Sequence, residues 1–402
     1  MTSGVGRFTF RGNLRQTRHG WLRLTPAYSL HLVRELAEAR ARPDLPVLDP
    51  FSGTGTTLLA CAELGVACES VELNPFLVWL AKAKVARYDA AGLRAAESAM
   101  AEACARARAP RGEAWTPPLH AIDRWWGRPT LDALARAFAV LEARALPPRA
   151  RDLCRLAFCR ALVAVSSASF RHQSMSFAEP PALRPAAART RVTDELAASL
   201  ASIAAAAARP LPRAARRVHH GDARQVARVL GARRYGTVIT SPPYANRMSY
   251  IRELRPYMYW LGYLRDGRAA GELDWRAIGG TWGAATSKLS RWEPAAGEAS
   301  TFAALPRLVR RIARESDVLG RYVERYAVDM ATHLRSLRAV VAEGGAIHYV
   351  VGNSKFFDVV VPIEELLATE MRAAGFSRPR IERLRKRTSK PELFEFRVSA
   401  RG

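Results

Sequence analysis

The apolar positions near the start of the chain follow a strand–turn–helix–strand pattern. Residues 45–49 form a short apolar run that predicts a buried strand, and a glycine-rich turn follows it. Residues 56–64 then predict a helix that ends at Gly65, a common residue at a helix C terminus. Residues 66–72 alternate between apolar and polar side chains, as a second strand does. This order is typical of dinucleotide-binding sheets.

Further along the chain, helical segments interrupt this pattern before strands return. From about residue 85 to 210 the sequence is rich in Ala and Arg, and we expect helices there. A second interruption, from about 266 to 320, mixes Trp with Gly, Arg and Ser and is expected to be irregular. The remaining predicted strands are 215–219, 236–240, 346–351, 378–384 and 393–399, and the remaining predicted helices are about 327–342 and 362–374. The fold class is therefore α/β, a parallel sheet with helices on both faces and two insertions.

The charge of the chain points to a polyanionic partner. Its formal net charge is +25, and 62 Lys and Arg face 37 Asp and Glu. Nucleic-acid binding would explain this excess, because neutralised phosphates release counterions. An alternative stays open, since only six of the 62 are Lys. Such an Arg bias, combined with many Ala, is also what the codon usage of a GC-rich genome produces.

Cysteine and histidine spacing gives no sign of a disulfide framework or a metal site. The five Cys form no CxxC pair, and the eight His show no ligand spacing with Cys or acids. We expect no metal and a reducing compartment. The chain opens without a signal peptide, and its apolar stretches are too short or too interrupted by Arg to span a bilayer. A cytoplasmic protein without a membrane partner is expected.

Three motifs after predicted strands suggest a nucleotide site. Gly53 and Gly55 lie in the turn after the first strand, where glycine lets the backbone approach a ligand. Glu72 ends the next strand, where an acid can accept hydrogen bonds from ribose hydroxyls, and Asn74 follows it. The Gly-Asp-Ala motif at 221–223 follows a later strand, so its Asp could accept from an adenine amino group. An ordinary turn or a strand-end carboxylate is the alternative for each motif.

The motif that indicates a reaction is Ser241-Pro242-Pro243-Tyr244, at the end of the predicted strand 236–240. The two prolines fix the backbone and remove N–H donors. The Pro242 carbonyl and the Ser241 side chain can then both accept from an NH2 group, which directs the nitrogen lone pair toward an incoming methyl. Tyr244 offers a flat face for an extruded base.

Together these motifs resemble the class I, Rossmann-like amino-methyltransferases that modify cytosine N4 or adenine N6 in DNA. The resemblance covers about half of the chain, the core without the insertions, and includes the segment 24–29 ahead of the glycine loop. It implies S-adenosyl-L-methionine as cofactor and double-stranded DNA as partner. Ser241 is similar to the cytosine-N4 branch, whereas Asp or Asn is more usual in the adenine-N6 branch. No Pro-Cys pair is present, which sets aside the 5-methylcytosine enzymes.

The resemblance also assigns roles to individual residues. Those expected to bind the cofactor are Thr25, Pro26, Asp49, Pro50, Phe51, Ser52, Gly53, Gly55, Thr56, Thr57, Glu72, Asn74, Asp222 and Ala223. Those expected to carry catalysis are Ser241, Pro242, Pro243 and Tyr244. Expected nucleic-acid contacts are Asn246, Arg247 and Arg252, with a solvated helix face as the alternative.

The same reading divides the chain into parts. The expected parts are 1–88, the first half of the cofactor-binding core; 89–212, a helical insertion for target recognition; 213–265, core with the SPPY motif; 266–325, an irregular insertion for DNA contacts; and 326–402, the end of the core. A basic cluster from Arg383 to Lys390 could form a phosphate-contacting rim, and the run 170–177 could contact DNA; a solvated or packed loop is the alternative for each. Rival functions are an RNA guanine-N2 methyltransferase, a silent nucleic-acid-binding protein and a glutamine-methylating modifier. A restriction or defence partner and the oligomeric state stay open.

Overall fold

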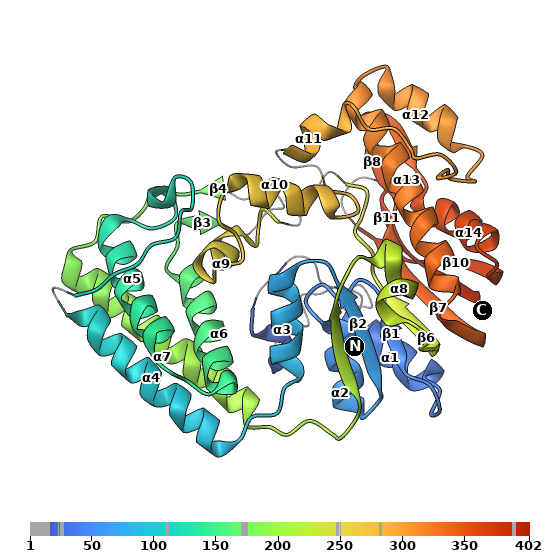
Figure 1. Cartoon of the computed structure of the whole chain (residues 1–402). Helices are drawn as coiled ribbons and strands as arrows, with labels where there is room; N and C mark the ends of the chain where they lie inside the picture. The colour runs from blue at the N-terminus through green and yellow to red at the C-terminus, as the bar shows by residue number, and fades with distance from the viewer. Residues whose placement is uncertain are drawn as a thin grey trace.

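The central element is one seven-stranded, mostly parallel sheet, seen in a computed structural model (Figure 1). The structure describes residues 17–22, 24, 28–109, 112–169, 176–246, 249, 251–280, 284–387 and 391–402. The strands lie in the order β10-β11-β7-β6-β1-β2-β5. Their bounds are β1 Val47–Asp49, β2 Cys68–Glu72, β5 Arg216–His220, β6 Tyr235–Thr240, β7 Val341–Gly352, β10 Ser377–Lys386 and β11 Phe394–Arg401.

The directions of the strands define a topological switch point in the sheet. β1 pairs in parallel with both β2 and β6, and β6 pairs in parallel with β7. β11 is antiparallel to both β7 and β10. The chain builds outward from β1 in one direction and then from β6 in the other, so the topological switch point lies between these two strands. Open α/β sheets bind ligands beyond the carboxyl ends at this point.

Helices cover both faces of the sheet, because the central strands are apolar on both sides. In β1, Val47 joins one buried cluster and its neighbour Leu48 joins another. The first cluster includes side chains of α1 (Leu30–Arg40), α2 (Thr56–Leu64) and α3 (Pro75–Val85). The second includes α8 (Val226–Leu230), α13 (Asp317–Arg338) and α14 (Ile363–Ala373). The predicted α/β fold with helices on both faces is confirmed.

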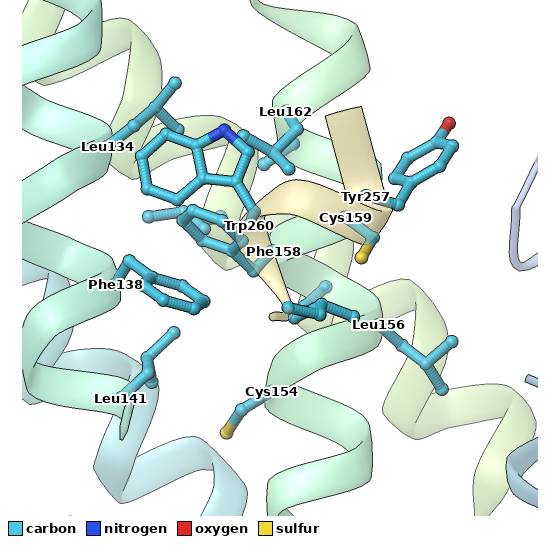
Figure 2. Close-up of a cluster of buried hydrophobic side chains, with 14 of the residues drawn as sticks. Leu134, Phe138, Leu141, Cys154, Leu156, Phe158, Cys159, Leu162, Tyr257 and Trp260 are labelled. Carbon is cyan, nitrogen blue, oxygen red and sulfur yellow. The ribbon is translucent and has the colours of Figure 1, made fainter. Parts of the chain in front are cut away.

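A separate helical body stands beside the sheet. Its helices are α4 (Ala90–Arg108), α5 (Arg128–Ala143), α6 (Pro148–Ala164) and α7 (Pro185–Ala207), as the Ala- and Arg-rich sequence predicted. Trp260, at the end of α9 (Arg255–Trp260), inserts into this body (Figure 2). Its ring centroid lies 5.2 Å from that of Phe158 and 5.3 Å from that of Phe138. The segment that follows the SPPY motif is therefore anchored in the helical body.

The second insertion was expected to be irregular, and this prediction is wrong. It contains α10 (Gly267–Arg276), α11 (Ala284–Leu289) and α12 (Leu305–Ala313). The last has apolar residues at helical spacing (Leu305, Leu308, Val309 and Ile312), a pattern that the surrounding Gly and Ser obscured. α13 begins ten residues before the predicted start, and a small hairpin of β8 (Ser354–Phe356) and β9 (Val359–Val361) was not expected.

Two remaining features concern the composition of the chain. All five cysteines are buried with free thiols. Within the described ranges, no helix is both long and apolar enough to cross a membrane.

The five-part division of the sequence stays a prediction.

Candidate functional site

Asp49 joins the two strand ends at the switch point. It is fully buried at the end of β1, and Thr240 at the end of β6 donates its hydroxyl to Asp49 Oδ1 at 2.6 Å. The backbone N–H of Phe51 donates to the same oxygen at 3.1 Å. Burial raises the pKa of Asp49 to about 6. Because Ser241 follows Thr240 directly, this bond holds the glycine loop and the SPPY motif side by side.

The glycine loop needs its glycines at two positions. Gly53 and Gly55 have φ angles of 50° and 78°, in the left-handed region that favours glycine. A Cβ at Gly55 would also lie 3.1 Å from the Cβ of Ala81 on α3. The loop therefore packs tightly on α3, just before the start of α2.

Glu72 and the glycine loop form one unit. Its carboxylate accepts from the Gly53 N–H and from the Asn74 N–H, each at 2.8 Å. Burial raises the pKa of Glu72 to about 7, although both backbone donors oppose this rise. The Asn74 side chain caps α3 by accepting from the Phe76 N–H at 3.0 Å, so the cap contributes to local structure.

Lys84 on α3 also stabilises the glycine loop. No sequence motif pointed to this residue. Its ammonium is buried on α3 and donates to the Thr54 carbonyl at 2.9 Å and to the His19 carbonyl at 3.5 Å. Desolvation lowers the pKa of Lys84 to about 7. The available signal was a run, 76–85, that is apolar apart from Lys82 and Lys84, because Lys is almost never fully buried unless it is paired.

The SPPY motif follows the carboxyl end of β6. Ser241 Oγ donates its proton to the Val350 carbonyl at 2.9 Å and is also hydrogen-bonded to the Tyr244 side chain, which leaves one of its two lone pairs for a further donor. The Pro243 carbonyl already accepts from the Tyr326 hydroxyl at 2.9 Å. Within the described part of the chain, no hydrogen bond is donated to the Pro242 carbonyl. Among the described residues, the Pro242 carbonyl and one lone pair of Ser241 Oγ are thus left to accept further hydrogen bonds.

Tyr244 is held by the β10–β11 hairpin. Its hydroxyl donates to Glu395 Oε1 at 3.0 Å, and Glu395 in turn accepts from Arg385 Nε at 2.8 Å. The guanidinium carbon of Arg387 lies 4.9 Å from the centre of the Tyr244 ring. Burial, followed by the charge of Glu395, raises the pKa of Tyr244, which keeps the phenol neutral. The sequence indicated only a basic rim here and not these contacts.

The Asp222–Ala223 segment is tied to the core through a buried histidine. His333 Nδ1 donates to the Ala223 carbonyl at 2.8 Å, and the Tyr349 hydroxyl donates to His333 Nε2 at 2.6 Å. Burial lowers the pKa of His333 to about 4, so the ring is neutral and this tautomer follows. The Phe51 ring meets the His333 ring edge to face at 4.7 Å. Neither His333 nor Tyr349 was expected at the site.

The carboxylate of Asp222 already has a cationic partner. The Arg224 guanidinium binds it through two nitrogens, with a shortest distance of 2.6 Å, and also donates to Asp329 at 2.8 Å. Burial raises the pKa of Asp222, but the hydrogen bonds and charge of Arg224 outweigh it and hold that pKa below its usual value. Asp222 is thus a charged acceptor.

The remaining predicted residues differ in their burial, and some lie outside the described residues. Thr57 is fully buried and donates to the Ile239 carbonyl at 3.2 Å, which ties α2 to β6. The side chains of Ser52 and Thr56 are also buried, as is Pro50. Asn246 donates its N–H to the Tyr244 carbonyl at 2.8 Å, and Arg252 is half-buried. Thr25, Pro26 and Arg247 lie outside the described residues, as do most of the run 170–177 and Lys390.

Short segments of the chain resemble known methyltransferases, whereas no family model matches. Over 68 residues it is 32% identical to Type II methyltransferase M.AvaI of Nostoc, covering 17% of this chain and 14% of that protein. Over 43 residues it is 40% identical to M.MjaII of Methanocaldococcus jannaschii, covering 11% and 8%. Over 49 residues it is 47% identical to M.SmaI of Serratia marcescens, covering 12% and 17%. The matches thus span less than a fifth of each relative.

The chain is also similar to a solved structure of a methyltransferase. That structure is the rRNA methyltransferase aviRa from Streptomyces viridochromogenes, at 14% identity and a TM-score of 0.30, with 98% of this chain and 96% of that one covered. The α/β fold follows from the order and direction of the strands in the sheet. The segments shared with three Type II methyltransferases support a methyltransferase class for this chain.

Proposed function

We propose that the chain is an S-adenosyl-L-methionine-dependent DNA methyltransferase that modifies an exocyclic amino group, cytosine N4 in particular. The observation that carries this proposal is the hydrogen bonding of Ser241 and Pro242. The Ser241 proton is used by the Val350 carbonyl, so two acceptor atoms stand next to each other at the carboxyl end of β6. An NH2 group has two donors and fits this pair.

The residues around the switch point fit the cofactor. The glycine loop has no side chain at its two turning positions, and Gly55 could not carry one without displacing Ala81. Glu72, at the end of β2, is the carboxylate for the ribose hydroxyls, and Asp222 is a charged acceptor for the adenine amino group. When bound there, S-adenosyl-L-methionine supplies a methyl group activated by its sulfonium.

The chain's own residues then position the base. Ser241 Oγ and the Pro242 carbonyl accept from the two amino hydrogens and orient the nitrogen lone pair toward the methyl. Tyr244 stacks on the extruded base, and its hydroxyl bond to Glu395 fixes the plane of the ring. Positioning in a water-poor site provides most of the rate acceleration. The amino proton can leave after the methyl transfer, so no strong base is required.

DNA is proposed as the substrate from the charge and the partial relatives. The net charge of +25 suits a polyanion, and the matched relatives carry the name Type II methyltransferase. A restriction or defence-system partner would agree with those names. Adenine N6 and an RNA amino group are the competing targets, and the product of the reaction distinguishes them.

The test is incubation with tritiated S-adenosyl-L-methionine and bulk DNA or bulk RNA, followed by nucleoside digestion and mass spectrometry. N4-methylcytosine from DNA is expected. N6-methyladenine would contradict the base assignment, and label confined to RNA would contradict the substrate. Ser241→Ala should lose turnover and keep cofactor affinity within a few fold, whereas Ser290→Ala, an exposed serine at the end of α11, should change neither.

A further inference from the structure

A cavity opens on the face of the sheet that carries α1. Its volume is about 190 Å³, and no carboxylate lines it. Four arginines line it together with one histidine. They come from the end of α1 (Arg40), from β7 (His348), from β10 (Arg378 and Arg380) and from β11 (Arg401).

The pairing of the strands explains why these side chains meet. His348 on β7 lies opposite Ser399 on β11, and Ser399 lies opposite Arg380 on β10. Directly opposed residues share a face of a sheet, as do residues two apart in one strand, so Arg401 joins the same face. The end of α1 is fixed above it, because Thr237 Oγ1 donates to the Arg40 carbonyl at 2.6 Å.

The arginines of this cavity have no acidic partner. Among the described residues none of the four forms an ion pair, and their side chains donate one hydrogen bond, from Arg401 to the Gly344 carbonyl at 3.3 Å. Arg42, two residues beyond the end of α1, is paired with Asp44 at 2.7 Å. All four arginines are exposed to solvent, and an anion bound among them would offset their mutual repulsion.

The histidine is buried and unpartnered. His348 is 7% exposed, and neither ring nitrogen has a hydrogen-bond partner among the described residues. Burial, followed by the charges of Arg397, Arg40 and Arg401, lowers the pKa of His348 to about 4. A buried N–H without an acceptor is costly, and an anion in the cavity would provide that acceptor.

We propose that this cavity binds a phosphate group. Arginine forks match phosphate oxygens in geometry, and His348 adds an N–H donor from the floor. At about 30 Å³ of liquid per water, the cavity holds roughly six waters, which leaves room for the five heavy atoms of a phosphate. The group could belong to a nucleic-acid backbone or be free in solution. The proposal does not depend on methyl transfer.

The experiment is a titration with inorganic phosphate in low-chloride buffer, followed by NMR of ring-labelled histidine. Saturable binding and a rise of the His348 titration midpoint are expected, because the anion favours the charged imidazolium. The double variant Arg380→Gln/Arg401→Gln should lose both effects. Arg94→Gln, an exposed residue of α4, should keep them. Absence of saturable phosphate binding, or its survival in the double variant, would overturn the proposal.

A second arm identifies the source of the phosphate. Affinity for a short DNA duplex is measured against salt for the same variants. If the backbone is the source, the double variant should bind the duplex at least tenfold more weakly and the salt slope should fall by about one to two phosphates. Unchanged duplex affinity, together with saturable inorganic phosphate binding, assigns the site to a free phosphate. Circular dichroism checks that each variant is folded.

Discussion

The backbone N–H of Gly53 donates to the carboxylate of Glu72 across 2.8 Å, so the glycine loop and the end of β2 are directly bonded. A proton on that carboxylate would weaken this bond and remove an acceptor for ribose hydroxyls. Burial raises the pKa of Glu72 to about 7, which brings its protonation into the neutral range. Cofactor affinity should therefore depend on pH.

Affinity for S-adenosylhomocysteine, measured by calorimetry, should fall as the pH drops below 7. The fall should approach tenfold per pH unit, because the ionised form of Glu72 is the binding form. Glu72→Gln should bind at least tenfold more weakly at pH 8 and show a flat profile. Glu364→Gln, which removes a buried carboxyl on α14 whose pKa is also raised to about 7, should keep the wild-type profile. A pH-independent affinity in the wild type would contradict this role.

Lys84 should make the free energy of unfolding depend on pH above neutrality. Its pKa is about 7 in the folded chain and about 10.4 when unfolded, so the unfolded state binds more protons between these values. Stability from this group therefore rises with pH by about 1.4 kcal/mol per unit between pH 7 and 10.

The variant Lys84→Met removes this titration. The difference in unfolding free energy between the variant and the wild type, measured by urea denaturation, should fall by about 3 kcal/mol from pH 7 to 9.5. Lys82→Met, an exposed neighbour on the same helix, should give a constant difference. Parallel curves for Lys84→Met and the wild type would show that Lys84 is charged throughout.

The sequence predicts the local motifs better than their connections. Asp49, Glu72 and Ser241 were found because each follows an apolar strand, and the ends of neighbouring parallel strands must meet. His333 and Glu395 could not be found in this way. Each lies more than a hundred residues from the residue it contacts, Ala223 and Tyr244 respectively, and no local pattern encodes such pairing. The helices α10 to α12 were missed because each has only 6 to 10 residues, too few turns for a periodic pattern to stand out among the surrounding Gly and Ser.

The Tyr244 hydroxyl and ring should contribute separately to turnover. Tyr244→Phe keeps the stacking face and loses the bond to Glu395, so kcat should fall about tenfold. Tyr244→Ala loses both, and kcat should fall at least a hundredfold with cofactor affinity within a few fold. Glu395→Gln keeps an acceptor and should resemble wild type more than Tyr244→Phe does. Steady-state methylation of DNA measures these values, and an alanine variant within threefold of wild type would refute the stacking role.

Trp260 should couple the helical body to the segment that follows the SPPY motif. Its side chain is 1% exposed and packs against the rings of Phe138 and Phe158, as Figure 2 shows. Trp260→Ala should destabilise the protein by about 3–5 kcal/mol, since a large cavity would open in the helical core. Trp115→Phe is a matched control, because the Trp115 ring also meets Trp260 but is 42% exposed.

The milder Trp260→Phe is suited to a functional readout, because the folded state should survive. It should leave S-adenosylhomocysteine affinity within about twofold and raise the KM for DNA, since α9 links the SPPY motif to the helical body along the chain. Denaturation and methylation kinetics on the same preparations separate the two effects. Equal destabilisation by Trp115→Phe and Trp260→Ala would show that Trp260 is not the anchor.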